Sequence, residues 1–360
     1  MPLDARLEAW ARVALAQVPT AALAPLLRAF GSAHALLRAS RAQVAAASSP
    51  AVADRLAAPL DVGLLDGIRK WLREPGHELV AWDDPDYPKA LLETGDGPPA
   101  LYFMGRRDLL NRPTLAIVGS RHATAQGCEN ARAFAEALSR AGLTIVSGMA
   151  LGVDAAAHEG ALRGPGSTIA CIGTGPDRVY PSRHRELAHV IALSGAVVSE
   201  FPPGTPPLRQ NFPRRNRLIS GLARGVLVVE ATLQSGSLIT ARLAGDQGRE
   251  VFAIPGSIHS PFAKGCHKLI REGAKLVETA QDVLDELKIP GLAAVPAPPA
   301  AGEEPPRSAL IEALGGDPCD LDTLIARTRI GPDALSAALV ELELEGHVAA
   351  LPGGKWQRVA

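Results

Sequence analysis

The sequence predicts an α/β protein whose largest domain is a parallel sheet covered by helices on both faces. Short runs of Val, Ile and Ala alternate with helical stretches between about residues 115 and 254. Strands that are apolar throughout are typical of parallel sheets buried on both sides. The expected strands are 115–119, 144–147, 168–172, 196–199, 226–230 and 251–254, and the expected helices are 130–141, 153–162, 186–193, 215–222 and 238–247. This alternation predicts a Rossmann-like, doubly wound fold.

An N-terminal helical domain is expected at residues 1–75, where Ala and Leu recur at helical spacing. Two of its helices flank a Gly31-Ser32 turn, which resembles a helix-hairpin-helix or sterile-alpha-motif unit. Such a unit binds DNA phosphates in some proteins and is structural in others, and both roles stay open. The Rossmann-like domain is expected at 76–288, entered through a turn-rich connector at about 83–104.

Beyond this domain, the proline-rich residues 289–306 are expected to form an extended linker. Residues 307–360 predict three helices and a β-hairpin, the order of a winged helix, with Asp320 capping the second helix. The third helix carries glutamates at 341, 343 and 345, which favours a structural or protein-contact role over DNA binding.

The overall composition describes a globular protein without a global charge bias. With 37 basic and 38 acidic side chains, any site for a polyanion must come from local segregation of charge. No apolar run is long enough to span a membrane, and the N-terminus lacks a signal-peptide pattern, so a cytoplasmic location is expected. The four cysteines are far apart and are expected to be reduced thiols, with no metal site.

Ligands of open α/β sheets bind beyond the carboxyl ends of the strands. Glycine- and serine-rich turns at those ends expose backbone N–H groups beside helix starts, which suits phosphate. Three such turns are Gly119-Ser120-Arg121, Ser147-Gly148 and Ser235-Gly236-Ser237. Because neither a GxGxxG nor a GxxxxGK[ST] motif occurs, dinucleotide and ATP cofactors are disfavoured.

The most informative segment is 201–229, which contains five arginines and no acidic residue. Several lie in Phe212-Pro213-Arg214-Arg215-Asn216-Arg217, where a helix is expected to begin. Cations at a helix start oppose the helix dipole, so an anionic ligand explains them better than helix stability does. The alternative is that Arg215 or Arg217 pairs with Glu200 or Glu230 at neighbouring strand ends.

Catalytic patterns are weaker. Asp154 and His158 are four residues apart on one helix, a spacing more often used for capping or packing than for acid–base chemistry. Ser235 and Ser237 lack the G-x-S-x-G context of a nucleophile. We therefore expect a protein that is not an enzyme and that needs no cofactor.

Taken as an ordered set, these residues resemble the DNA-processing protein A (DprA/Smf) family. The motifs are Gly119-Ser-Arg121, Ser147-Gly-Met-Ala-Leu-Gly-Val-Asp-Ala-Ala-Ala-His158, Gly173-Thr-Gly175, Tyr180-Pro181, Ser199-Glu-Phe-Pro-Pro-Gly-Thr-Pro-Pro207, Phe212-Pro-Arg-Arg-Asn-Arg-Leu-Ile-Ser-Gly-Leu222, Val229-Glu-Ala231, Ser235-Gly-Ser-Leu-Ile-Thr-Ala241, Gly248-Arg249 and Pro255-Gly256. The resemblance implies a protein that binds and protects incoming single-stranded DNA and loads the RecA recombinase during natural transformation and recombination. It also implies a homodimer formed through the Rossmann-like domain, with contacts near residues 265–270.

Carried over by position, the resemblance places a set of residues at the DNA. The predicted DNA-binding residues are Gly119, Ser120, Arg121, Ser147, Gly148, Arg214, Arg215, Asn216, Arg217, Ser235, Gly236 and Ser237. One departure concerns Ser182 and His184, where many relatives carry lysine and asparagine; the nearby Arg183 and Arg185 would replace the missing charge. Single-stranded DNA also needs base stacking, which the sequence does not reveal, because Phe212 is the only aromatic residue of the arginine cluster.

Two other functions stay open on the sequence alone. The first is a nucleotide-binding or nucleotide-processing Rossmann-like enzyme, although the Pro-Gly-Gly-x-Gly-Thr loop expected of such families is missing from the sheet region. The second is a scaffold that binds RecA or competence factors, with DNA contact incidental.

Overall fold

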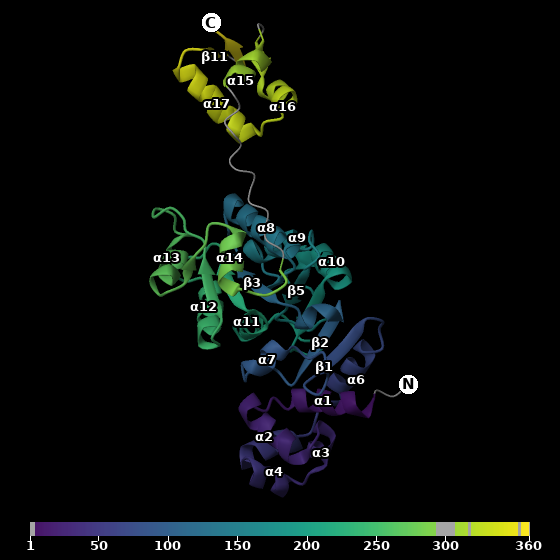
Figure 1. Ribbon diagram of the computed structural model, residues 1–360. Coiled ribbons are helices and arrows are strands. Elements are labelled where there is room, and N and C mark those ends of the chain that lie inside the picture. Colours follow the sequence, from purple (N-terminus) through teal and green to yellow (C-terminus); the bar gives the residue numbers. More distant parts are fainter. Residues whose placement is uncertain (1–3, 293–306, 316–317, 352–353, 360) are drawn as a thin grey trace. The chain divides into compact units, whose positions relative to one another are not determined.

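The computed structural model describes residues 4–292, 307–315, 318–351 and 354–359 (Figure 1). By their contacts these residues fall into two compact units, divided between residues 295 and 296. Most of the linker expected at 289–306 lies outside the described residues. The first unit contains a nine-stranded sheet with its helices, and the second contains a small three-stranded sheet with three helices.

The large sheet confirms the predicted parallel architecture. Its strands are β1 (His77–Ala81), β2 (Ala100–Gly105), β3 (Thr114–Val118), β4 (Thr144–Ser147), β5 (Thr168–Cys171), β6 (Ala196–Ser199), β7 (Gly225–Val228), β8 (Glu250–Ala253) and β9 (Lys275–Leu276). Their order is β1-β2-β6-β5-β4-β3-β7-β8-β9, and all pairs from β6 to β9 are parallel. The chain runs outward from β3 to β6 and then restarts at β7 on the other side of β3. This switch point opens a crevice between the carboxyl ends of β3 and β7, where open α/β sheets bind ligands.

Helices cover both faces of the sheet, as the apolar strands predict. Within β3, Ala116 and Val118 pack toward one face and Leu115 and Ile117 toward the other, and all four are buried. The first face is covered by α7 (Lys89–Glu93), α11 (Asn211–Leu222), α12 (Ser237–Asp246) and α13 (Lys264–Arg271), and the second by α8 (Ala125–Arg140), α9 (Val153–Ala161), α10 (Arg185–Ser194) and α14 (Ala280–Leu287). Short 3-10 segments occur at Arg107–Asn111 and Ser182–His184.

Six N-terminal helices form a separate hydrophobic cluster that continues onto the sheet. They are α1 (Ala5–Leu15), α2 (Thr20–Phe30), α3 (Ala33–Arg38), α4 (Arg41–Ala47), α5 (Pro50–Ala57) and α6 (Val62–Trp71). The expected turn is present: Gly31 adopts φ of 81° after α2, and the Ser32 side chain caps α3. The cluster includes residues of β1 and β2 such as Leu79 and Tyr102. The proposed domain boundary at 75/76 therefore lies inside one packed unit.

Strands β1 and β2 were not expected from the sequence, and neither were the two-residue strands β9 and β10 (Cys319–Asp320). Strand β2 lies within the region expected to be a turn-rich connector, and β1 precedes it; they pair antiparallel with each other, and β2 pairs antiparallel with β6. The local signals there are dominated by Asp84-Pro85 and Gly97-Pro98, which are turn formers. These residues form strands because β2 pairs with β6 and both strands pack against the N-terminal helices. Neither contact can be inferred from the local sequence.

The second unit confirms the winged-helix order. It consists of α15 (Arg307–Leu314), β10 (Cys319–Asp320), α16 (Leu321–Thr328), α17 (Pro332–Leu344), β11 (Val348–Leu351) and β12 (Lys355–Arg358). The Asp320 carboxylate accepts a hydrogen bond from the Thr323 amide at 2.8 Å, which confirms it as the cap of α16. Of the acidic residues on α17, Glu343 accepts a hydrogen bond from the Ala350 amide at 3.0 Å and so joins the helix to the hairpin.

Two absences hold for the described part of the chain. None of its helices has the length and apolarity needed to cross a bilayer. No group of three or more His, Cys, Asp or Glu side chains within it is arranged to hold a metal ion. All four cysteines are free thiols.

The close packing of α8 on α9 gives a test of the fold. A Cβ at Gly160 in α9 would lie 2.1 Å from the Arg132 carbonyl oxygen of α8, so Gly160→Ala must push the helices apart. We expect a loss of about 1–3 kcal/mol in the free energy of unfolding, measured with urea. The control is Gly245→Ala in α12, where a Cβ meets nothing within 4 Å; it should gain about 0.5–1 kcal/mol. Equal stabilities of the two variants would contradict this packing.

Candidate functional site

A cavity of about 410 Å³ lies at the switch point of the sheet, and we call it the arginine cavity. It is enclosed by the turn after β3, the first turns of α11, and the segment from β7 into α12. Its lining residues are Val118, Gly119, Ser120, Arg121, His122, Ala150, Asp154, Phe212, Pro213, Arg215, Asn216, Ile219, Thr232, Gln234, Ser235, Gly236, Ser237, Ile239, Thr240 and Phe262. Segments far apart in the sequence thus meet at the edge where the fold predicts a ligand.

The turn after β3 is held by backbone hydrogen bonds. The Ser120 amide donates to the Glu230 carbonyl oxygen at 2.7 Å, and the Ser120 carbonyl oxygen accepts from the Val153 amide at 3.2 Å. The Glu230 carboxylate is occupied elsewhere: it accepts from the Thr124 amide and hydroxyl at 2.9 and 2.6 Å. Glu230 therefore anchors the start of α8 and pairs with no arginine of the described residues.

Arg121 is the exposed cation of the cavity. Its guanidinium carbon lies 5.9 Å from the centroid of the Phe212 ring, within the range of a cation–π contact. Throughout the described residues no carboxylate approaches Arg121 within ion-pair distance, although ion pairs are common elsewhere among them. Its positive charge is therefore available to an anion.

On the opposite wall the start of α12 faces the cavity. The Ser235 and Ser237 hydroxyls are 2.7 Å apart, and the Ser237 amide donates to Ser235 Oγ at 3.3 Å. A Cβ at Gly236 would meet nothing within 4 Å, so the turn is open to a ligand. Because the positive end of the helix dipole lies here, the wall favours a negatively charged group.

Arg215 forms the floor of the cavity and is buried, with 3% of its surface exposed. Its Nη1 donates to the Cys171 carbonyl oxygen at 2.7 Å at the end of β5, and its Nε has no partner within the described part of the chain. Burial lowers the pKa of Arg215, and the nearby Asp154 carboxylate opposes that shift. A buried cation of this kind raises the potential of the cavity without itself being a mobile surface charge.

Asp154, in the first turn of α9, balances this arginine. Its carboxylate accepts from the amides of Gly148 and Ala150 at 3.1 and 3.2 Å. Gly148 has no room for a side chain, because a Cβ there would lie 1.9 Å from Arg215 Nη1 and 2.8 Å from Asp154 Oδ2. Position 148 must therefore be glycine, because any side chain there would clash with the Arg215 guanidinium.

Arg214 and Arg217 turn away from the cavity toward Glu200. Their guanidinium groups lie 2.9 and 2.6 Å from Glu200 Oε2, whose side chain is 1% exposed. Arg217 also donates to the Asp96 carbonyl oxygen. From the sequence alone, pairing of Arg217 with Glu200 was the alternative to anion binding. The structure contains this ion pair, and Arg214 pairs with the same carboxylate.

The structure brings most of the predicted DNA-binding residues together. Those that line the arginine cavity are Gly119, Ser120, Arg121, Arg215, Asn216, Ser235, Gly236 and Ser237. The other four are Ser147, Gly148, Arg214 and Arg217. Ser147 is fully buried and its hydroxyl donates to the Ile117 carbonyl oxygen at 2.7 Å, so it ties β4 to β3.

Several lining residues were not singled out from the sequence. His122, Thr232, Gln234 and Phe262 lie at the cavity, and Phe212 contacts Tyr180 with 5.4 Å between ring centroids. His122, Thr232 and Gln234 lie in the turns that follow β3 and β7, so their position after strand ends was a usable signal. Phe262 comes from a loop after β8, and nothing local marks it.

Asp154 and His158 do not form an acid–base pair. His158 is fully buried, its Nδ1 lies 2.7 Å from the Thr168 hydroxyl, and its Nε2 has no partner within the described chain. Burial lowers the pKa of His158 to about 3, so the folded protein holds a neutral imidazole. Asp154 instead accepts hydrogen bonds from the backbone amides of Gly148 and Ala150, and His158 packs in the core beside Thr168.

Comparison with known proteins adds to this picture. A sequence model of the DNA recombination-mediator protein A family matches residues 78–288, and a model of the DprA winged helix domain matches residues 294–354. The chain is 44% identical to Protein Smf of Escherichia coli over 293 residues, covering 79% of this chain and 78% of that protein. It is 49% identical over 205 residues to the DNA processing protein DprA of Streptococcus pneumoniae, covering 57% of this chain and 72% of that protein.

Two solved structures are similar to the chain. The crystal structure of DprA from Streptococcus pneumoniae aligns with a TM-score of 0.69 at 39% identity, covering 79% of this chain and 99% of the other. DNA processing protein A from Helicobacter pylori aligns with a TM-score of 0.53 at 31% identity, covering 59% of this chain and 96% of the other; that structure concerns its single-stranded-DNA binding mode.

The buried His158 predicts a pH dependence of stability. Its pKa is about 3 when folded and near 6.5 when exposed, so the unfolded chain binds more protons between these values. Stability from this group is therefore present above pH 6.5 and falls as the pH drops toward 3, by up to about 1.4 kcal/mol per pH unit. His158→Asn, which keeps a side-chain nitrogen for Thr168, should lose less stability between pH 6.5 and 4 in urea titrations. Parallel pH profiles of the two proteins would show that His158 is not buried as a neutral imidazole.

Proposed function

Because the chain belongs to the DNA recombination-mediator protein A family, we propose that it binds single-stranded DNA in the arginine cavity. The observation that carries this proposal is the exposed Arg121, which has no carboxylate partner within the described residues and faces the start of α12 across the cavity. Single-stranded DNA needs basic groups, sequence-tolerant contacts and aromatic faces, and all three occur here. The Helicobacter pylori relative, reported with a single-stranded-DNA binding mode, supports the same ligand class.

Each part of the cavity has a proposed role. Arg121, the Ser120 turn and the Ser235-Gly236-Ser237 turn contact phosphate oxygens through charge, hydroxyl groups and backbone amides. Phe212 offers a ring face to a base. Asn216 and Gly119 complete the wall, and buried Arg215 supplies positive potential from below.

The remaining predicted residues are proposed to act through the shape of the site. Gly148 makes room for Arg215, and Ser147 fixes β4 beside β3. Arg214 and Arg217 neutralise the buried Glu200 at the far side of α11. Arg214 is half exposed in addition, so it also adds positive charge to the surface along which a strand would pass.

The wider role follows from the family. We propose that the protein protects incoming single-stranded DNA and loads RecA on it during natural transformation and recombination, in the cytoplasm. We also propose a homodimer formed through the Rossmann-like domain, with residues 265–270 of α13 among its contacts. The protein acts in this proposal by binding rather than by catalysis, and the separate packing of Asp154 and His158 supports that.

The test is the salt dependence of binding to fluorescently labelled oligo(dT). Arg121→Ala should weaken binding about tenfold or more at moderate salt, since hydrogen bonds to charged groups contribute about 1.5–3 kcal/mol. The slope of log affinity against log salt should fall by roughly 0.7 for each phosphate that the variant no longer neutralises.

The matched control is Arg28→Ala, which removes one exposed arginine from α2. Its affinity and slope should stay close to the wild-type values. An Arg121→Ala variant that binds oligo(dT) with unchanged affinity and slope rules out the arginine cavity as the DNA site. Competition by free mononucleotides at equal potency would instead favour a nucleotide-binding function.

A further inference from the structure

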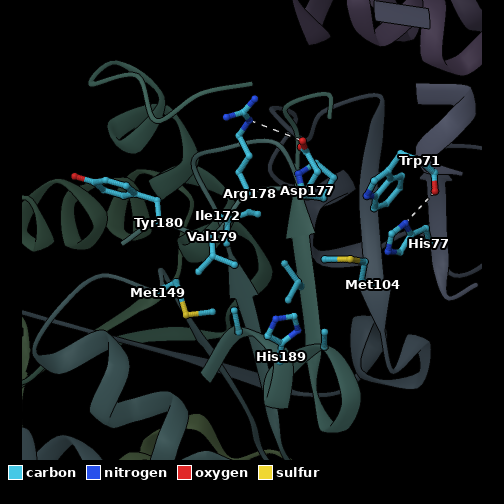
Figure 2. A pocket seen from close by; sticks show the side chains of 14 residues that line it. Trp71, His77, Met104, Met149, Ile172, Asp177, Arg178, Val179, Tyr180 and His189 are labelled. Carbon is cyan, nitrogen blue, oxygen red and sulfur yellow. Dashed lines mark hydrogen bonds and ion pairs between the residues drawn. The ribbon is translucent and has the colours of Figure 1, made fainter. Parts of the chain in front are cut away.

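A second cavity of about 330 Å³ lies beside the first, and we call it the Trp71 cavity (Figure 2). Its walls come from α6, β1, β2, β6, the ends of β4 and β5, the loop before the Tyr180-Pro181 bond, and α10. The lining residues are Trp71, His77, Met104, Met149, Ile172, Pro176, Asp177, Arg178, Val179, Tyr180, Ala188, His189, Ala192 and Val197. Most of these side chains are apolar or aromatic, so the cavity suits a flat, weakly polar group.

One wall of this cavity is a pair of stacked rings. The Trp71 indole and the His77 imidazole lie with centroids 4.3 Å apart and planes at 16°, side by side in Figure 2. The His77 ring is fixed by a contact of 2.9 Å between its Nδ1 and the Trp71 carbonyl oxygen. Trp71 is 6% exposed, and its Nε1–H has no acceptor within the described residues. A ligand with a carbonyl oxygen or ring nitrogen would supply that acceptor.

The two cavities are joined by aromatic residues. Tyr180 lines the Trp71 cavity, and its ring centroid is 5.4 Å from that of Phe212, which lines the arginine cavity next to Arg121. The chain neighbours Met149 and Ala150 likewise line one cavity each. A strand bound at Arg121 therefore reaches the Trp71 cavity by passing over the Tyr180 ring, which is 50% exposed.

The charge along this path is favourable for a nucleic-acid backbone. Arg178, Arg183 and Arg185 are exposed around the loop that contains Tyr180. The acidic residue at the rim, Asp177, is already engaged: it accepts from the Gly204 amide at 2.8 Å and lies 3.8 Å from Arg178 Nε. Phosphates entering from the arginine cavity thus meet cations, with the carboxylate of Asp177 partly neutralised.

We propose that the Trp71 cavity holds a base of the same DNA strand whose phosphates occupy the arginine cavity, an inference that rests on the proposed function. The base lies among the apolar walls, stacks with the aromatic side chains of the rim, and accepts a hydrogen bond from Trp71 Nε1–H through a carbonyl oxygen or ring nitrogen. Since all four bases carry such an acceptor, the contact tolerates any sequence.

The most direct test is to fill the Trp71 cavity with a larger side chain. Ala188→Trp on α10 places a large ring in it, whereas Leu193→Trp adds the same ring on the same helix at a position that is 81% exposed and does not line it. Oligo(dT) of 3 to 12 nucleotides is titrated into each protein. We expect Ala188→Trp to lose roughly 5- to 100-fold in affinity for the longer strands, the range of one base–aromatic contact. The shortest strands, which reach the arginine cavity alone, should bind all three proteins alike.

A second variant and a cross-linking experiment keep the inference testable if the filled protein folds poorly. Trp71→Phe keeps an aromatic ring but removes the N–H donor, and should weaken binding of the longer strands a few-fold. Strands with a single 5-iodouracil should photo-cross-link from one position to peptides containing Trp71, Tyr180 or His189.

If wild type binds DNA in an Arg121-dependent way but Ala188→Trp equals Leu193→Trp at every length, and no cross-link reaches those peptides, the Trp71 cavity is not a base site. If wild type does not bind oligo(dT), or binds it independently of Arg121, both proposals are overturned.

Discussion

The site depends on one interaction, the burial of the Arg215 guanidinium beneath the carboxyl ends of β4 and β5. Its hydrogen bond to the Cys171 carbonyl oxygen and the nearby Asp154 carboxylate compensate a charge that is otherwise costly to bury. Asp154 in turn holds the Gly148 and Ala150 amides, and Gly148 has no room for a side chain. The turn after β4, the start of α9 and the position of α11 are thus fixed by one buried cation.

The carboxylate partners within the protein also determine which arginines are available to a ligand. Glu200 is buried and pairs with both Arg214 and Arg217, so both guanidinium groups already have a carboxylate partner within the protein. Glu230 is used by Thr124 at the start of α8. Arg121 has no such partner within the described residues and lies beside Phe212 and opposite the Ser235-Gly236-Ser237 turn. Of the two arginines that line the arginine cavity, Arg121 is therefore exposed and Arg215 is buried beneath it.

Sequence reasoning predicted the parts that are encoded locally. Strands β3 to β8 were predictable because they are apolar on both faces, and the cavity edge followed from their carboxyl ends. Strands β1 and β2 were not, because turn formers dominate nearby and their pairing partners are distant in sequence. The arginine cluster was visible as a whole, but the choice of Glu200 for Arg217 depends on tertiary packing. The contact between Tyr180 and Phe212, which joins the two cavities, also depends on tertiary packing and could not be predicted from the local sequence.

The central claim is that DNA binds at the carboxyl edge of the large sheet, and hydrogen–deuterium exchange tests it most directly. Backbone amides are compared with and without saturating oligo(dT) at low salt. We expect slower exchange for residues 119–122 and for 235–239 at the start of α12, with little change in 307–315 and 318–351. Protection confined to those winged-helix residues or to the N-terminal helices, with exchange in the two turns unaltered, would contradict it.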